Sequence, residues 1–178
     1  RLRTLSRNKD LSGALEVYRD RANDSVRDGH HACIVVDCCA RCGSILEGEK
    51  IIEEMKRAGS HINIETSTAL LKGYSLAGMI DKADDLFKSM CSAKARRDLP
   101  NTRSLNTLLR GCLWSAARPD KNGAMVGGVV TSERAWYLCK ELQDQGRVNA
   151  IFDVSSYEYS ISLLCQALRT SDAIARIN

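Results

Sequence analysis

The clearest signal in this sequence is a paired pattern of apolar positions with helical spacing. Side chains three and four residues apart share one face of an α-helix, so such spacing predicts an amphipathic helix. Two runs of this kind lie on either side of Gly78, which interrupts the pattern. The first run is Leu70, Leu71 and Tyr74, and the second is Ala83, Leu86, Phe87 and Met90.

The two-helix pattern recurs along the chain. Residues 40–59 align with residues 75–94 at an offset of 35, which pairs Gly43 with Gly78 and Met55 with Met90. Residues from Arg7 onward join this alignment 34 residues upstream, and residues 68–74 match residues 106–112 at an offset of 38. We therefore predict one array of five units, the first and last partial, with approximate spans 1–28, 29–63, 64–101, 102–153 and 154–178.

A single pair of short helices cannot bury its apolar face, so neighbouring units must stack. The expected fold is all-α, an α-solenoid of stacked antiparallel two-helix repeats whose first helices line a concave surface. The fourth unit is lengthened by an insertion at residues 118–130, which we predict to be a flexible loop. Its "NGAMVGGVV" lacks the Gly-Lys-Ser/Thr ending of a phosphate loop. Trp114 and Trp136 flank the insertion, and we expect both to fill the core between helices.

Composition and charge set broad limits on function. The 178 residues are 44% hydrophobic and 27% charged, which is typical of a folded domain. A net charge of +4 permits a polyanionic partner without requiring one. No apolar run approaches the roughly 20 residues that cross a bilayer, so no membrane partner is expected. The chain starts at Arg1 and shows no signal peptide, so we expect a piece of a longer protein whose targeting segment and further domains lie elsewhere.

Eight cysteines are many for this length, and "DCCARCGS" resembles half of a zinc site. Zinc needs four ligands, usually from two pairs, and a second pair with suitable spacing is missing. Cys38 and Cys42 share a helical face, whereas Cys39 points about 100° away from Cys38. We predict buried free thiols in a reducing compartment, with neither a metal nor a cofactor.

The sequence contains no recognisable catalytic constellation. The acidic pairs Glu53–Glu54 and Asp84–Asp85 fall on the second helices of their units, where a solvated face is the ordinary role. His61 lies in a loop between repeats, with no nucleophile placed near it by the repeat pattern. We therefore predict that this chain is not itself an enzyme.

Two segments resemble pentatricopeptide repeats: "CIVVDCCARCGSILEGEKIIEEMKRAGSHIN" and "SLNTLLRGC". The features they share with that family are a two-helix unit of 35 residues, an Ala-Gly or Cys-Gly break and the ending "EEMKRAG". The related tetratricopeptide family opens with Trp-Leu-Gly-x-x-Tyr, which this sequence lacks. The resemblance covers essentially the whole chain, and it implies binding of single-stranded RNA at about one base per repeat.

The resemblance also implies which residues read the bases. In this family a reading residue early in the first helix works with a partner residue at the end of the unit. The reading residues map to Cys33, Thr68, Asn106 and Glu158, and the partner residues map to Asn63, Asn101 and Asp153. Thr68 with Asn101 resembles the pair that favours adenine, and Asn106 with Asp153 resembles the pair that favours uracil. Cys33 and Glu158 depart from the usual reading residues.

Two partner positions have alternatives because of three-residue insertions. Asp98 could replace Asn101, and Ala150 could replace Asp153. Residues three places before the reading residues flank the base in this family, and His30 and Arg103 could stack there. Three further basic residues, Arg41, Lys72 and Arg110, lie near the expected groove, where a solvated helix face is their simpler role.

The leading expectation is a single-stranded RNA-binding module of an organellar RNA-processing or RNA-modifying protein, in a mitochondrion or chloroplast as the family implies. One alternative is the transfer-RNA-binding arm of an RNA enzyme whose nuclease or methyltransferase domain lies outside this chain. In that role the array binds a structured RNA and recognises its shape. The other alternative is a helical scaffold that binds proteins or ribosomes, which the atypical reading residues favour.

Overall fold

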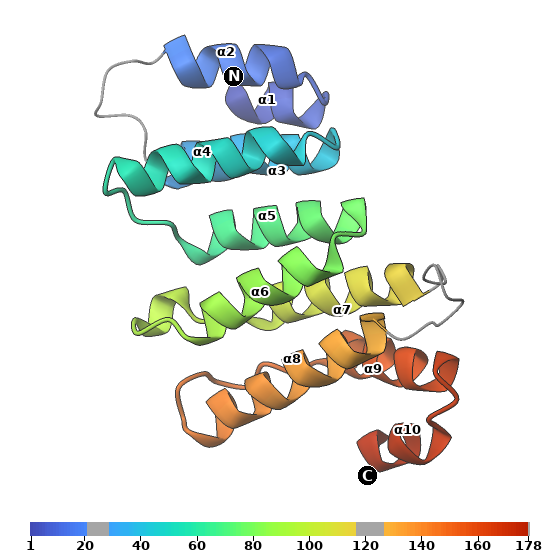
Figure 1. Cartoon of the computed structure of the whole chain (residues 1–178). Coiled ribbons are helices and arrows are strands. Elements are labelled where there is room, and N and C mark those ends of the chain that lie inside the picture. Colours follow the sequence, from blue (N-terminus) through green and yellow to red (C-terminus); the bar gives the residue numbers. More distant parts are fainter. Residues whose placement is uncertain (21–28, 117–126, 178) are drawn as a thin grey trace. The chain divides into compact units, whose positions relative to one another are not determined.

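The computed structural model describes residues 1–20, 29–116 and 127–177, and this part of the chain contains α-helices and no strand (Figure 1). Ten α-helices and one short 3-10 helix lie within it. The helices group into two compact units, Arg1–Ala77 and Gly78–Asn178. The all-α, two-helix-repeat fold predicted from the sequence is confirmed.

The first unit is built around its third helix. Its helices are α1 (Leu2–Arg7), α2 (Leu11–Asp20), α3 (Gly29–Arg41), α4 (Ile45–Arg57) and α5 (Ile64–Ala77). Helix α3 contacts all four others, and its most extensive contact is with α5. Val35, Val36 and Cys38 of α3 are almost completely buried at these contacts. The first helices of successive repeats therefore pack on one another within this unit.

Two glycines shape the first unit. Gly43 joins α3 to α4 with a φ of +73°, a left-handed conformation that side chains with a Cβ disfavour. Gly73 lies where α5 approaches α3, and a Cβ there would sit 2.6 Å from Ile45 Cδ1 and 3.3 Å from Ala40 Cβ. These positions need glycine for different reasons, a turn in one case and close helix packing in the other.

The second unit repeats the same design. It contains α6 (Ile80–Cys91), the 3-10 helix η1 (Arg96–Asp98), α7 (Thr102–Ala116), α8 (Gly127–Asp144), α9 (Val154–Gln166) and α10 (Thr170–Ile177). Helix α7 packs on α8 within its repeat and on α9 of the next repeat. Buried side chains from all of these α-helices form the core, including Phe87, Leu105, Leu108, Leu109, Cys139 and Leu163.

One buried charge links two second helices. Asp84 of α6 is 6% exposed, and its carboxylate pairs with Lys88 at 2.8 Å and with Arg134 of α8. A buried carboxylate is costly unless it is paired, so these two cations offset its desolvation. Asp84 therefore joins α6 to α8, which corrects the expectation that it lies on a solvated face.

Three further expectations need correction. Helix α8 begins at Gly127, so the last residues of the predicted 118–130 loop are helical, and residues 117–126 lie outside the described part. Trp136 is buried as expected, but Trp114 is 47% exposed. All eight cysteines are free thiols, of which Cys33 and Cys42 are half-buried and Cys165 is exposed. Among the described helices, none is long and apolar enough to cross a membrane.

Candidate nucleic-acid interface

The three predicted partner residues share a structural role, because each stands directly before a first helix. A side-chain oxygen at this position accepts a backbone N–H that the helix leaves without a partner. The donor in each case is the residue three places later, which carries a hydroxyl group. The bonds are Thr66 N to Asn63 Oδ1 at 2.9 Å, Ser104 N to Asn101 Oδ1 at 3.0 Å and Ser156 N to Asp153 Oδ1 at 2.9 Å.

The alternative partner positions lie elsewhere. Asp98 is half-buried in η1, three residues before Asn101. Ala150 carries no polar side-chain atom, and it precedes Asp153 by three residues. Asn101 and Asp153 are therefore the residues whose side chains lie at the helix starts.

In the second unit, one predicted reading residue is hydrogen-bonded to its predicted partner residue. Asn106 of α7 donates from Nδ2 to Asp153 Oδ1 at 2.9 Å. Its other amide atom, Oδ1, accepts from Ser156 Oγ at 2.7 Å. The Ser156 hydroxyl also receives the Asp153 backbone N–H at 3.2 Å, which completes a capping box on α9. Three polar side chains from two successive repeats thus form one connected network.

The network also sets the charge state of Asp153. The hydrogen bond from Asn106, followed by that from the Ser156 backbone, holds the pKa of the Asp153 carboxyl below its ordinary value. Hydrogen bonds to a carboxylate favour its ionised form. An ionised carboxylate only accepts hydrogen bonds, so the Nδ2 end of Asn106, and not its Oδ1, must face Asp153.

The other predicted reading residues have different surroundings. Cys33 is half-buried on α3, and Glu158 is exposed on α9. Thr68 of α5 is only 6% exposed. Asn106 is half-buried, and its side chain is hydrogen-bonded to the partner residue of its own unit.

A single stripe on α7 carries basic, polar and aromatic side chains. Arg103, Asn106, Arg110 and Trp114 are spaced by three or four residues, so they lie within one face of the helix. Arg110 Cζ stacks 5.1 Å from the centre of the Trp114 ring. The Nε of Arg110 is buried without a hydrogen-bond partner, and neither Arg103 nor Arg110 pairs with a carboxylate in the described part of the chain. We call these four residues the α7 stripe.

The basic residues predicted in the first unit are instead paired. Lys72 lies 2.9 Å from Asp37 Oδ1, and Arg41 lies 3.0 Å from Asp37 Oδ2. His30 accepts a hydrogen bond from Arg3 at 2.9 Å. Asp37 offsets one of the two positive charges of Arg41 and Lys72, so these residues differ in their pairing from the arginines of the α7 stripe.

Sequence reasoning missed two features of this interface. It placed Trp114 in the core, because apolar spacing alone does not separate a buried tryptophan from one at a helix edge. It also overlooked the hydroxyl residues Thr66, Ser104 and Ser156. The pattern of Asn or Asp followed three residues later by Ser or Thr would have indicated these helix starts.

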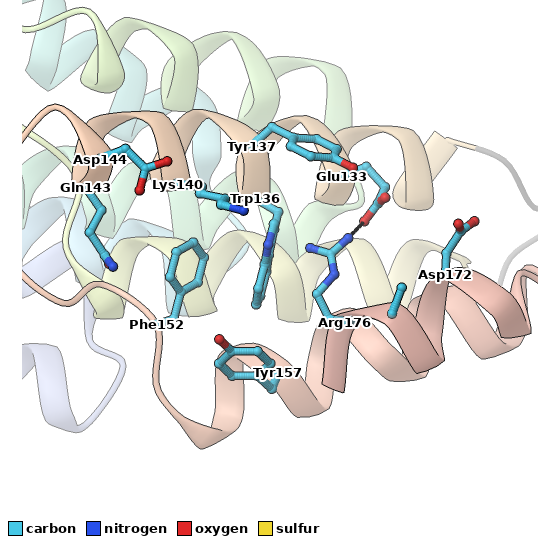
Figure 2. Close-up of a pocket in the computed structure, with 11 residues that line it drawn as sticks. Glu133, Trp136, Tyr137, Lys140, Gln143, Asp144, Phe152, Tyr157, Asp172 and Arg176 are labelled. Carbon is cyan, nitrogen blue, oxygen red and sulfur yellow. Dashed lines mark hydrogen bonds and ion pairs between the residues drawn. The ribbon is translucent and has the colours of Figure 1, made fainter. Parts of the chain in front are cut away.

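A pocket of about 380 Å³ lies elsewhere in the second unit, between α8, α9 and α10 (Figure 2). The ring centres of Trp136 and Phe152 lie 4.2 Å apart. The Cζ atom of Arg176 lies 4.2 Å from the centre of the Trp136 ring. Arg176 also pairs with Glu133, which connects α10 to α8. Arg176 thus covers the tryptophan, and we interpret the pocket as part of the packing of the last repeat.

The described residues hold no group of three or more His, Cys, Asp or Glu side chains placed to bind a metal ion. The thiols of the "DCCARCGS" segment are packing groups in α3 and the turn after it. Burial raises the pKa of Cys39 to about 12, so this thiol stays protonated at neutral pH. A deprotonated thiolate is what a zinc site would require.

The sequence matches a known repeat family. A model of the family described as the pentacotripeptide-repeat region of PRORP matches residues 1–129, which is more than half of the chain. No curated protein matches the sequence. The matched residues cover the first three predicted repeats and α7. The chain therefore belongs to the family of pentacotripeptide-repeat regions of PRORP.

Proposed function

We propose that this chain is the RNA-recognition part of an RNA-processing protein and that it holds RNA against the α7 stripe. The observation that carries this proposal is the hydrogen-bonded pair Asn106–Asp153, flanked on one helix face by two arginines that have no carboxylate partner within residues 1–20, 29–116 and 127–177. Such a surface offers one hydrogen-bonding group for a base and two cations for the backbone. Phosphate contacts position a nucleic acid, and base contacts give it specificity.

The Asn106 side chain can pair with a pyrimidine that presents a hydrogen-bond donor and an acceptor side by side. Its amide has two N–H donors and an oxygen with two lone pairs. The bonds to Asp153 and Ser156 occupy one donor and one lone pair, so one of each is left for a ligand. Uracil presents an N3–H donor beside a carbonyl acceptor, which matches the remaining pair. We therefore expect uracil at this position, as the family resemblance also implies.

Arg110 and Trp114 supply contacts that do not depend on sequence. The exposed part of the half-buried Arg110 guanidinium, which pairs with no carboxylate among the described residues, provides a cation for a phosphate oxygen. The exposed Trp114 ring offers a stacking surface for a base or ribose, worth about 1–3 kcal/mol per stacked base. Arg103 adds a second cation, or a stacking plane for the base, at the start of the same helix.

We infer that the ligand is a folded RNA such as a transfer-RNA precursor. One connected reading pair in the described part of the chain specifies little sequence, so shape and backbone contacts must provide most of the affinity. The family description, a repeat region of PRORP, supports a role in RNA processing. On this account the catalytic domain lies in another part of the protein, and the protein works in a mitochondrion or chloroplast as many relatives of this repeat type do.

Binding assays with two RNAs test this proposal. A transfer-RNA precursor transcript should bind more tightly than a single-stranded RNA of the same composition. Asn106→Ala should lower the preference for a uracil-rich over a cytosine-rich 12-mer by roughly tenfold, the value of one or two hydrogen bonds. Asn149→Ala is the matched control, because Asn149 is an exposed asparagine that bonds Arg96 outside the α7 stripe. If no RNA binds the wild-type chain, the proposal is wrong and a protein-binding scaffold becomes the better account.

A further inference from the structure

Ser156 connects a helix start in one repeat to base reading in the repeat before it. The residue is completely buried, and its hydroxyl group reaches from α9 to the Asn106 amide of α7. We propose that Ser156 is a positioning residue for base recognition, which sets the orientation of the Asn106 amide. This inference rests on the proposed function, because it concerns the same site.

The geometry holds the amide at both ends. Asp153 Oδ1 holds the Nδ2 end at 2.9 Å. The one hydroxyl hydrogen of Ser156 has two acceptors in reach, Asn106 Oδ1 at 2.7 Å and Asp153 Oδ1 at 3.0 Å, and the shorter distance places it on the Oδ1 end of the Asn106 amide. With a single anchor, the amide plane could pivot about the bond to Asp153. With two anchors, the free donor and the free lone pair point in defined directions. These directions decide which base can pair with Asn106, because uracil presents an N3–H donor where cytosine presents an N3 acceptor.

The hydroxyl of the equivalent residue in the first unit, Thr66, bonds at its own helix start and to the start of the preceding first helix. Asn63 caps α5 by accepting a hydrogen bond from the Thr66 backbone N–H, as Asp153 caps α9 by accepting one from the Ser156 backbone N–H. The Thr66 hydroxyl lies 2.8 Å from Asn63 Oδ1 and 3.3 Å from the backbone oxygen of Gly29, at the start of α3. The contact between Ser156 and Asn106 is therefore more than a consequence of capping.

It follows that the sequence at the start of one repeat tunes the base preference of the preceding repeat. A Ser or Thr at this position would hold the amide and sharpen discrimination. An alanine at this position would keep the hydrogen bond from its backbone N–H to Asp153. It would leave the Asn106 amide with one anchor. Base preference at Asn106 thus depends on three side chains: Asn106, Asp153 and Ser156.

The experiment compares Ser156→Ala with Ser156→Thr, using uracil and cytosine 12-mers as the RNA probes. Ser156→Ala should lower the uracil-over-cytosine preference about two- to tenfold, which is the net value of one hydrogen bond, with little loss of affinity for the transfer-RNA precursor. Ser156→Thr keeps the hydroxyl and should keep the preference. Thr66→Ala, which deletes a buried hydroxyl at the equivalent position, should also leave this preference unchanged.

A second readout needs no RNA. In the wild-type chain the NMR signals of the Asn106 side-chain amide should show slow exchange with water, and in Ser156→Ala this exchange should become severalfold faster. Unchanged exchange together with unchanged uracil preference in Ser156→Ala would overturn the inference and leave the proposed function standing. If Asn106→Ala itself does not alter base preference, the proposed function fails at this site, and the positioning role of Ser156 fails with it.

Discussion

At the scale of single residues, Asp153 combines two tasks. It caps α9 through the Ser156 backbone N–H, and it orients Asn106 through a hydrogen bond to Nδ2. Both tasks need the carboxylate form. Because Asp153 both caps α9 and holds the residue that we propose to contact the base, we expect a change at Asp153 to affect stability and RNA recognition together.

The charge state of Asp153 leads to a prediction about pH. Its folded-state pKa lies below the ordinary value of an aspartate, about 3.9, so the stabilisation it provides is present above that value and is lost as the pH falls through the folded pKa. The uracil-over-cytosine preference should therefore be the same at pH 8 and pH 5. Binding of the two 12-mers measured at both pH values checks this. A preference that falls between pH 7 and pH 5 would show that another group controls the site.

At the scale of structural elements, the turns from α3 to α4 and from α5 to α6 each contain a glycine with positive φ, Gly43 and Gly78. Gly43 has a φ of +73°, and a Cβ at this position would meet no heavy atom within 4 Å. Glycine is therefore favoured at this position by the backbone conformation and not by a lack of space. Gly48 lies inside α4, where a Cβ would be 3.5 Å from Cys39 Cβ, an ordinary contact distance.

These two glycines form a matched pair for a stability measurement. Gly43→Ala should destabilise the protein by about 1–2 kcal/mol, because a Cβ disfavours the left-handed conformation. Gly48→Ala should be neutral or stabilising by up to about 1 kcal/mol, because alanine favours the helix interior. Urea unfolding followed by circular dichroism compares them. Equal effects of the two substitutions would mean that the turn at Gly43 does not limit stability.

The elements were more predictable than the site. Apolar spacing and the glycine breaks indicate each helix pair, since burial of one face is a property of the local sequence. The start of α8 was predicted too late, because the run from Gly127 to Val130 contains two glycines that disfavour a helix when taken alone. Packing decides whether Trp114 is buried, and contacts between repeats decide what Ser156 touches. The burial of Trp114 and the contacts of Ser156 therefore cannot be predicted from the sequence of a single repeat.

At the scale of the whole molecule, the basic residues predicted near the groove differ in their pairing between the two units. Arg103 and Arg110 of the second unit have no carboxylate partner among the described residues, whereas Arg41 and Lys72 of the first unit share Asp37. The net charge of +4 does not reveal this difference. RNA affinity should thus depend on the α7 stripe more than on overall charge.

The salt dependence of RNA binding tests the central claim most directly. Each phosphate contact contributes about 0.7 to the slope of log affinity against log salt for a single strand, and about 0.9 for a duplex. For a transfer-RNA precursor, the double variant Arg103→Ala with Arg110→Ala should reduce this slope by roughly 1–2. The variant Arg41→Ala with Lys72→Ala loses the same formal charge and should change the slope less. An unchanged slope in the first variant, or an equal reduction in both, would contradict RNA binding at the α7 stripe.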